Sequence, residues 1–125
     1  MAGLFFPVSS WFAAFVLTLA VEIPVAAFIL RRAEPNFLRL AILIVFANLA
    51  THLAVWYVIT QLFRVGTLTY GIVAESWAIA CESIFYGAAI RGLSPGRAIG
   101  VAIVANGLSY LVGRVVGEPL LEPFL

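Results

Sequence analysis

Four long runs of apolar residues, separated by three short polar segments, dominate the pattern of the chain. The runs cover residues 11–30, 38–63, 70–90 and 97–116. Each is close to the roughly 20 residues that an α-helix needs to cross the hydrocarbon core of a bilayer. The pattern therefore predicts an all-α membrane protein with four transmembrane helices.

The three segments between these runs contain residues that end helices. Pro35 lies in the first segment, and Gly92, Pro95 and Gly96 form a cluster in the third. Because all three connections are short, consecutive helices should be antiparallel neighbours in an up-down-up-down bundle. We expect a single domain over residues 1–125, and no internal repeat is evident by eye.

Composition supports a membrane protein and excludes a nucleic-acid-binding one. The chain is 64% hydrophobic and 10% charged, with a mean hydropathy of +1.12. A soluble domain of this size has too small an interior to bury so much apolar surface. The net charge of +1 provides no basic footprint for nucleic acid. We expect an integral protein of a prokaryotic-type inner or plasma membrane, with the lipid bilayer as its first partner.

The seven basic residues are all arginines, and their distribution predicts an orientation. Two lie at the end that holds the second connection, namely Arg64 and Arg114. Five flank the first and third connections, namely Arg31, Arg32, Arg39, Arg91 and Arg97. The positive-inside rule places these two connections in the cytoplasm and both termini outside.

Each predicted span carries a polar or ionisable residue near its middle, where such groups are costly and usually face the bundle interior or a water-filled cavity. Asn48 and His52 share one face because they are four residues apart. The full set is Glu22, Asn48, His52, Glu82 and Asn106. We predict that these five residues form an ion- or substrate-binding site.

A second polar layer is expected nearer the end of the bundle that holds the second connection. Glu75 of the third span and Arg114 of the fourth lie there, on helices that are sequential neighbours. A lone charge at that depth is unfavourable, and an ion pair offsets part of the cost. We therefore predict that Glu75 and Arg114 form a supporting ion pair or share a hydrogen-bond network.

The first functional hypothesis is ion- or proton-coupled transport, or ion binding. Glu22 and Glu82 would exchange a proton for a cation or substrate, and His52 would relay protons. Four helices rarely enclose a path alone, so we expect a homo-oligomer, and the GRVVG segment at 113–117 has the small-residue spacing of close helix contacts. Small four-helix multidrug exporters also have this size and a glutamate in the first helix, which is an analogy of size because no further motif matches.

Two alternatives remain open. In the first, the polar residues join helices by hydrogen bonds, and the chain is a structural or scaffold subunit of a larger membrane complex. In the second, His52, Glu22 and Glu82 hold a divalent metal ion within the membrane, with or without catalysis. Neither HExxH nor ExxH occurs, and GxSxG, P-loop, GxGxxG and CxxC patterns are also missing from the sequence, which favours a protein that is not an enzyme.

Overall fold

The structure is a computed structural model that describes residues 8–117, and all the regular structure in that range is helical. The elements are α1 (Val8–Leu30), α2 (Phe37–Ala54), η1 (Val55–Ile59), α3 (Thr60–Leu62), α4 (Leu68–Ala89), α5 (Pro95–Val112) and η2 (Gly113–Gly117). The η1 and η2 segments are single π-helical turns. Every predicted apolar run falls on one of these helical stretches, and the all-α fold is confirmed.

Side-chain caps and glycine turns fix where the helices begin. Asn36, Thr67 and Ser94 precede α2, α4 and α5, and each side-chain oxygen accepts a hydrogen bond from a backbone N–H of the first turn. Such caps satisfy N–H groups that have no partner within the helix. Gly66 and Gly92 adopt φ values of +88° and +80° in the turns before α4 and α5, a conformation that glycine tolerates best.

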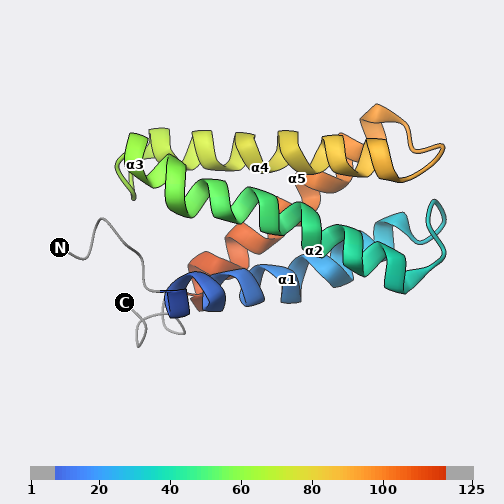
Figure 1. Ribbon diagram of the computed structural model, residues 1–125, viewed down its shortest axis with the longest axis horizontal. Helices are drawn as coiled ribbons and strands as arrows, with labels where there is room; N and C mark the ends of the chain where they lie inside the picture. Colours follow the sequence, from blue (N-terminus) through green and yellow to red (C-terminus); the bar gives the residue numbers. More distant parts are fainter. Residues whose placement is uncertain (1–7, 118–125) are drawn as a thin grey trace.

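The four long helices form a ring around one core. Helix α1 packs against α2 and α5, and α4 packs against the same two helices. Figure 1 shows that the α1–α2 and α4–α5 connections lie at one end of the molecule, whereas α3 lies at the other end. Helices α1 and α4 therefore run in the same direction and face each other diagonally across the ring.

Small residues allow the helices of this ring to approach closely, as is common in membrane proteins. The fully or almost fully buried alanines are Ala26, Ala47, Ala98, Ala102 and Ala105. Larger apolar side chains, including Leu30, Leu40, Ile44 and Ile90, complete the core. The outer surface is also apolar, with Phe28 67% exposed and Ile84 70% exposed. Apolar groups on both the inside and the outside are typical of a helix bundle surrounded by lipid.

Three stretches of the described chain are long and apolar enough to cross a membrane, namely Phe12–Leu30, Phe37–Leu62 and Pro95–Val115. These helices indicate a membrane location. Helix α4 is of similar length, but Glu75 and Glu82 lower its hydropathy, and its passage through the membrane stays a prediction. The two chain ends, which the sequence assigns to the outside, lie beyond the described residues.

Arg39 bridges two parts of the chain at the arginine-rich end of the bundle. Arg39 Nη1 lies 2.9 Å from Glu34 Oε2 in the α1–α2 connection. Its Nη2 donates a hydrogen bond to the carbonyl oxygen of Ala89 at the end of α4, at 3.1 Å. Arg39 therefore joins the α1–α2 connection to the last turn of α4.

The close packing of α5 gives a first testable prediction. Replacing the fully buried Ala102 by Leu forces extra methyl groups into a filled interface, which typically costs about 1–3 kcal/mol of stability. Val104→Leu adds volume on the same helix at a position that is 45% exposed, and serves as the control. Thermal unfolding of the purified protein in detergent should show a lower midpoint for Ala102→Leu than for Val104→Leu. Equal midpoints would contradict the packing described for α5.

Candidate functional site in the polar core

Glu22 of α1 and Asn48 of α2 form the first of two buried carboxyl–amide pairs. Asn48 Nδ2 donates to Glu22 Oε2 at 2.7 Å and to the carbonyl oxygen of Ile44, one turn earlier on its own helix, at 3.0 Å. Glu22 is fully buried and Asn48 is 1% exposed. Both neighbours of Nδ2 are acceptors, so the amide can be oriented only with its nitrogen toward Glu22.

Glu82 of α4 and Asn106 of α5 form the second pair in the same way. Asn106 Nδ2 donates to Glu82 Oε2 and, at 2.8 Å, to the carbonyl oxygen of Ala102. Glu82 is fully buried and Asn106 is 6% exposed. The carbonyl of Ala102 and the carboxyl of Glu82 fix the amide orientation here too.

A serine joins the two pairs to each other. Ser109 Oγ lies 3.0 Å from Glu22 Oε1 and 3.1 Å from the carbonyl oxygen of Asn106. The hydroxyl has one proton and can donate to one of these acceptors at a time. Ser109 thus links α5, which carries the second pair, to α1, which carries the first. The sequence reasoning missed Ser109, because a lone serine in an apolar helix costs little and carries no charge.

The two carboxyl groups also meet each other. Glu22 and Glu82 lie within hydrogen-bonding reach across the centre of the ring, although they belong to diagonally opposite helices. Glu82 Oε1 is buried and receives no hydrogen bond from a donor within residues 8–117. Asn48 Oδ1 and the hydroxyl of Tyr86 are buried and without a partner in the same part of the chain. The centre of the bundle is therefore polar and only partly satisfied.

The two pairs arise from the same pattern in the two halves of the chain. Segment 47–51 reads ANLAT and segment 105–109 reads ANGLS. Upstream, the spacing from glutamate to arginine and to proline is the same in both halves, and the glutamate-to-asparagine spacing is 26 and 24 residues. The matching positions are Glu22 and Glu82, Arg31 and Arg91, Pro35 and Pro95, Asn48 and Asn106, and Thr51 and Ser109.

The molecule is therefore built from two similar helical hairpins, α1–α2 and α4–α5. Both hairpins run in the same direction, and the four helices close into a ring (Figure 1). Exchanging the two hairpins leaves the order of neighbours around the ring unchanged, which is the arrangement that an approximate two-fold axis parallel to the helices produces. This repeat corrects the expectation that the chain has none. It was hidden because the matching residues are few and the apolar residues between them vary.

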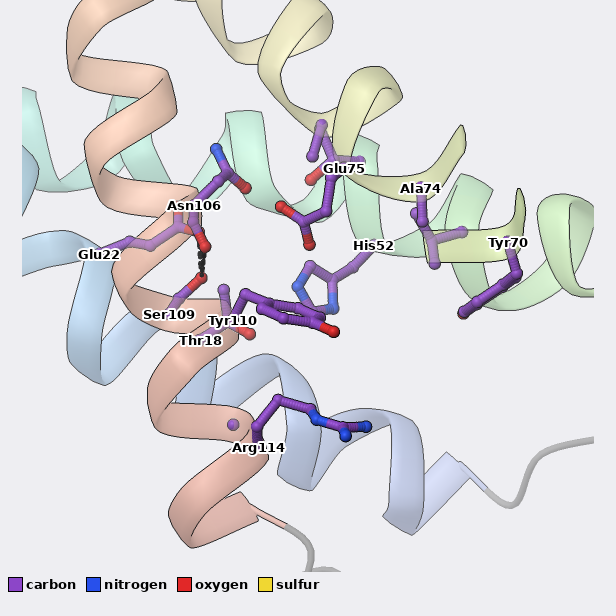
Figure 2. A pocket seen from close by; sticks show the side chains of 14 residues that line it. Thr18, Glu22, His52, Tyr70, Ala74, Glu75, Asn106, Ser109, Tyr110 and Arg114 are labelled. Atoms are coloured by element: carbon purple, nitrogen blue, oxygen red, sulfur yellow. Dashed lines mark hydrogen bonds between the residues drawn. The ribbon is translucent and has the colours of Figure 1, made fainter. Parts of the chain in front are cut away.

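A pocket of about 260 Å³ opens beside Glu22. Glu22 and Asn106 lie at its inner end, whereas Tyr70, near the start of α4, and Arg114, beyond α5, lie toward the end of the bundle that holds α3. Figure 2 shows the hydrogen bond from Ser109 to Glu22 at one side of the pocket and Arg114 at another. The pocket thus extends from Glu22 toward one end of the molecule.

The wall of this pocket is where the two hairpins differ. His52 of α2 occupies the position that Tyr110 has in α5, and Phe15 of α1 occupies the position that Glu75 has in α4. The Phe15 and His52 rings pack edge to face with their centroids 5.6 Å apart. His52 Nδ1 is buried and has no hydrogen-bond partner within the described segment. The second hairpin therefore contributes Glu75 and Tyr110 to the pocket, whereas the first contributes His52, which packs against Phe15.

The structure brings together most of the residues that the sequence singled out. Glu22, Asn48, Glu82 and Asn106 share one buried network, whereas His52 lies one helical turn from Asn48 in the pocket wall. The supporting residues Glu75 and Arg114 both line the pocket, and their ion pair stays a prediction.

The hypothesis of a metal site with ligands His52, Glu22 and Glu82 gains no support from the geometry. Within residues 8–117, no group of three or more His, Cys, Asp or Glu side chains is arranged to hold a metal ion. Moreover, both asparagines direct N–H groups, which repel a cation, at the carboxyl groups.

No protein-family model, curated protein or solved structure gives a significant match to this chain. The function is therefore argued from the polar core and its pocket.

A double-mutant cycle tests the pairing within the core. Asn48→Ala should destabilise the protein by about 1–3 kcal/mol, because a buried carboxyl group loses its donor. Most of this loss should vanish when Glu22 is already replaced by Leu, since the two side chains contact each other. The control cycle combines Asn48→Ala with Glu82→Leu, which removes a carboxyl group that Asn48 does not bond. Chemical unfolding in detergent gives the free energies, and equal coupling in both cycles would contradict the assigned partners.

Proposed function

We propose that the chain is a four-span, up-down-up-down membrane protein that binds and moves a proton or small ion through the Glu22–Glu82 carboxyl pair. The observation that carries this proposal is a pair of fully buried carboxyl groups, one of which, Glu22, lines a pocket. Ionisable groups buried at mid-membrane depth are costly and mark ion pathways and proton relays.

The proposed membrane passage of α4 is supported by where its polar residues lie. Glu82 is fully buried and Glu75 is half-buried, so neither carboxyl group has to contact lipid. The large apolar residues Ile72, Trp77 and Ile84 are exposed on the same helix. A helix that hides its charges and exposes its apolar groups suits a lipid environment despite its moderate hydropathy.

The alternative role as a scaffold subunit explains the core less well. Polar residues that serve only to join helices are expected to satisfy one another. Here Asn48 Oδ1 and the Tyr86 hydroxyl are buried and lack hydrogen-bond partners within the described residues. Buried polar atoms without partners at the centre of the bundle favour a site that exchanges a proton or ion with its surroundings.

The pocket also supports a one-sided route to the carboxyl pair. It extends toward the end of the bundle that holds α3, whereas Leu30, Leu40 and Ile90 belong to the buried apolar core on the opposite side. A second pocket at that end is lined by Arg39 and residues 87–92 and does not include Glu22 or Glu82. Transport would require this apolar end to open, and a homo-oligomer would supply the additional walls that four helices lack. Under the predicted orientation, the pocket opens to the outside.

Proton movement is the direct test of this function. Purified protein in liposomes that contain a pH-sensitive dye should dissipate an imposed pH gradient faster than empty liposomes. The Glu22→Gln, Glu82→Gln double variant should fall to the rate of empty liposomes, because it removes both carboxyl groups that can exchange a proton. Glu34→Gln, which neutralises a glutamate in the α1–α2 connection, should keep the wild-type rate. Identical traces from the wild type and the double variant would remove the proposal.

Cysteine labelling tests the orientation and the passage of α4 through the membrane. In a Cys81→Ala background, Val65→Cys should react with an impermeant maleimide in intact cells, because the positive-inside rule places the second connection outside. Pro35→Cys and Gly96→Cys, at the other end, should react only after permeabilisation. All three positions are exposed, and a side chain at Gly96 meets open space. Reaction of Val65→Cys and Gly96→Cys from the same side would show that α4 does not cross.

A further inference from the structure

We infer that the Glu22–Glu82 pair holds a single proton, carried on Glu82 and donated to Glu22, and that a proton rather than a metal cation is the ion of the polar core. This inference rests on the proposed function, because it names the cargo of the same site. It follows from an inventory of hydrogen-bond donors and acceptors around the two carboxyl groups.

Glu22 is surrounded by donors. Its Oε2 accepts from Asn48 Nδ2 at 2.7 Å, and Ser109 Oγ lies 3.0 Å from its Oε1. An ionised carboxylate is an acceptor only, so this environment fits an ionised Glu22. A carboxylate in an apolar interior requires such bonds from neighbouring helices.

Glu82 is different, because only one of its oxygens has a donor. Asn106 Nδ2 donates a hydrogen bond to Glu82 Oε2, whereas Glu82 Oε1 is buried and has no hydrogen-bond partner among the described residues. If Glu82 were ionised, Oε1 would be an unsatisfied buried acceptor beside a second carboxylate. A proton on Glu82 turns one of its oxygens into a donor, and the Glu22 carboxyl group lies within hydrogen-bonding reach of the Glu82 carboxyl group.

The repeat makes this asymmetry visible. Ser109 and Thr51 occupy equivalent positions in the two hairpins, so a symmetric core would give each glutamate one hydroxyl. Ser109 lies within hydrogen-bonding distance of Glu22, but Thr51 Oγ1 donates to the carbonyl oxygen of Asn48 instead, at 3.0 Å. A proton on Glu82 replaces the donor that the second hairpin does not provide.

Placing the proton on Glu22 satisfies the core less completely. Glu22 could donate to Ser109 Oγ, which would then donate to the carbonyl oxygen of Asn106. Glu82 Oε1 would remain without a donor in that arrangement. A proton on Glu22 could also be donated to Glu82, but the ionised group would then be Glu82, which has one side-chain donor. The proton on Glu82 instead leaves Glu22 as the carboxylate, with two side-chain donors within hydrogen-bonding distance.

The asparagines argue against a metal cation. A cation between the carboxyl groups would be bound by amide oxygens, which are its preferred ligands. In both pairs, the amide nitrogen is held toward the carboxyl group by a second bond to its own helix, to Ile44 in one case and Ala102 in the other. Turning either amide would bring its oxygen against a backbone carbonyl oxygen.

Other ionisable groups line the surroundings of the pair. Helix α2 contributes His52, and α1 contributes Glu22 itself. Helix α4 contributes Glu75 and Tyr86, while α5 and η2 contribute Tyr110 and Arg114. Release of the proton leaves two adjacent carboxylates and raises the negative charge of the pair from one to two. Uptake restores the hydrogen bond between them, so one turnover moves one proton.

Infrared spectroscopy of the purified protein tests the proton directly. At neutral pH, the wild type should show the carbonyl stretch of a protonated carboxyl group, shifted to lower frequency in heavy water. Glu82→Gln should lose this band and keep its thermal stability, because the amide N–H₂ replaces the donating O–H. Glu34→Gln should retain the band, because its carboxylate belongs to the Arg39 ion pair at the end of the bundle.

The outcomes separate this inference from the proposed function. A missing band in the wild type, or a band that persists in Glu82→Gln, would overturn the single proton on Glu82. Loss of the band on addition of Na⁺, K⁺ or Mg²⁺ at constant pH would overturn the preference for a proton. Proton flux without the band would reject this inference and leave the transport proposal standing. The band without flux would support the shared proton and reject transport.

Discussion

The need to satisfy two carboxyl groups inside an apolar bundle determines how the helices of this protein are arranged. Glu22 and Glu82 are fully buried, and each accepts a hydrogen bond from the asparagine of its own hairpin. Ser109 then bonds across the hairpins to Glu22. An unpaired charge in this environment would cost several kcal/mol. The register between helices therefore has to keep these side chains at one depth, and the alanine-rich packing brings the backbones close enough to do so.

The approximate two-fold symmetry brings two carboxyl groups together at the centre of the bundle. It places the same acidic residue of each hairpin on opposite sides of the axis, where two like charges repel. The two hairpins differ at the hydroxyl groups beside these carboxyl groups. Ser109 Oγ lies within hydrogen-bonding distance of Glu22, whereas Thr51 Oγ1 donates to the carbonyl oxygen of Asn48 and not to Glu82. The hairpins differ again in the pocket, where the second hairpin has Glu75 at the position of Phe15. A symmetric scaffold thus carries an asymmetric site with one exposed approach.

The sequence predicted the helices and the depth of the polar residues because both follow from local properties. Hydropathy locates the spans, and the rise per residue places Glu22, Asn48, Glu82 and Asn106 at similar depths. The partners could not be predicted, because they depend on which helices are neighbours and how each is rotated. Ser109 was missed for the same reason, since a serine in a helix can bond its own backbone. The metal hypothesis failed to gain support for the same reason. The presence of His52, Glu22 and Glu82 in the sequence does not show whether their side chains point toward one common position.

The distribution of polar and apolar groups along the axis limits how a proton could cross. On the side of α3, the pocket reaches Glu22 without crossing the apolar core. On the arginine-rich side, Leu30, Leu40 and Ile90 separate the carboxyl pair from the surface. The bond from Arg39 to the carbonyl oxygen of Ala89 also joins the hairpins there. A transport cycle would have to separate the hairpins at this end while Ser109 and the carboxyl pair keep them in contact at the centre. The central hydrogen bonds would then act as the pivot of the motion as well as the binding site.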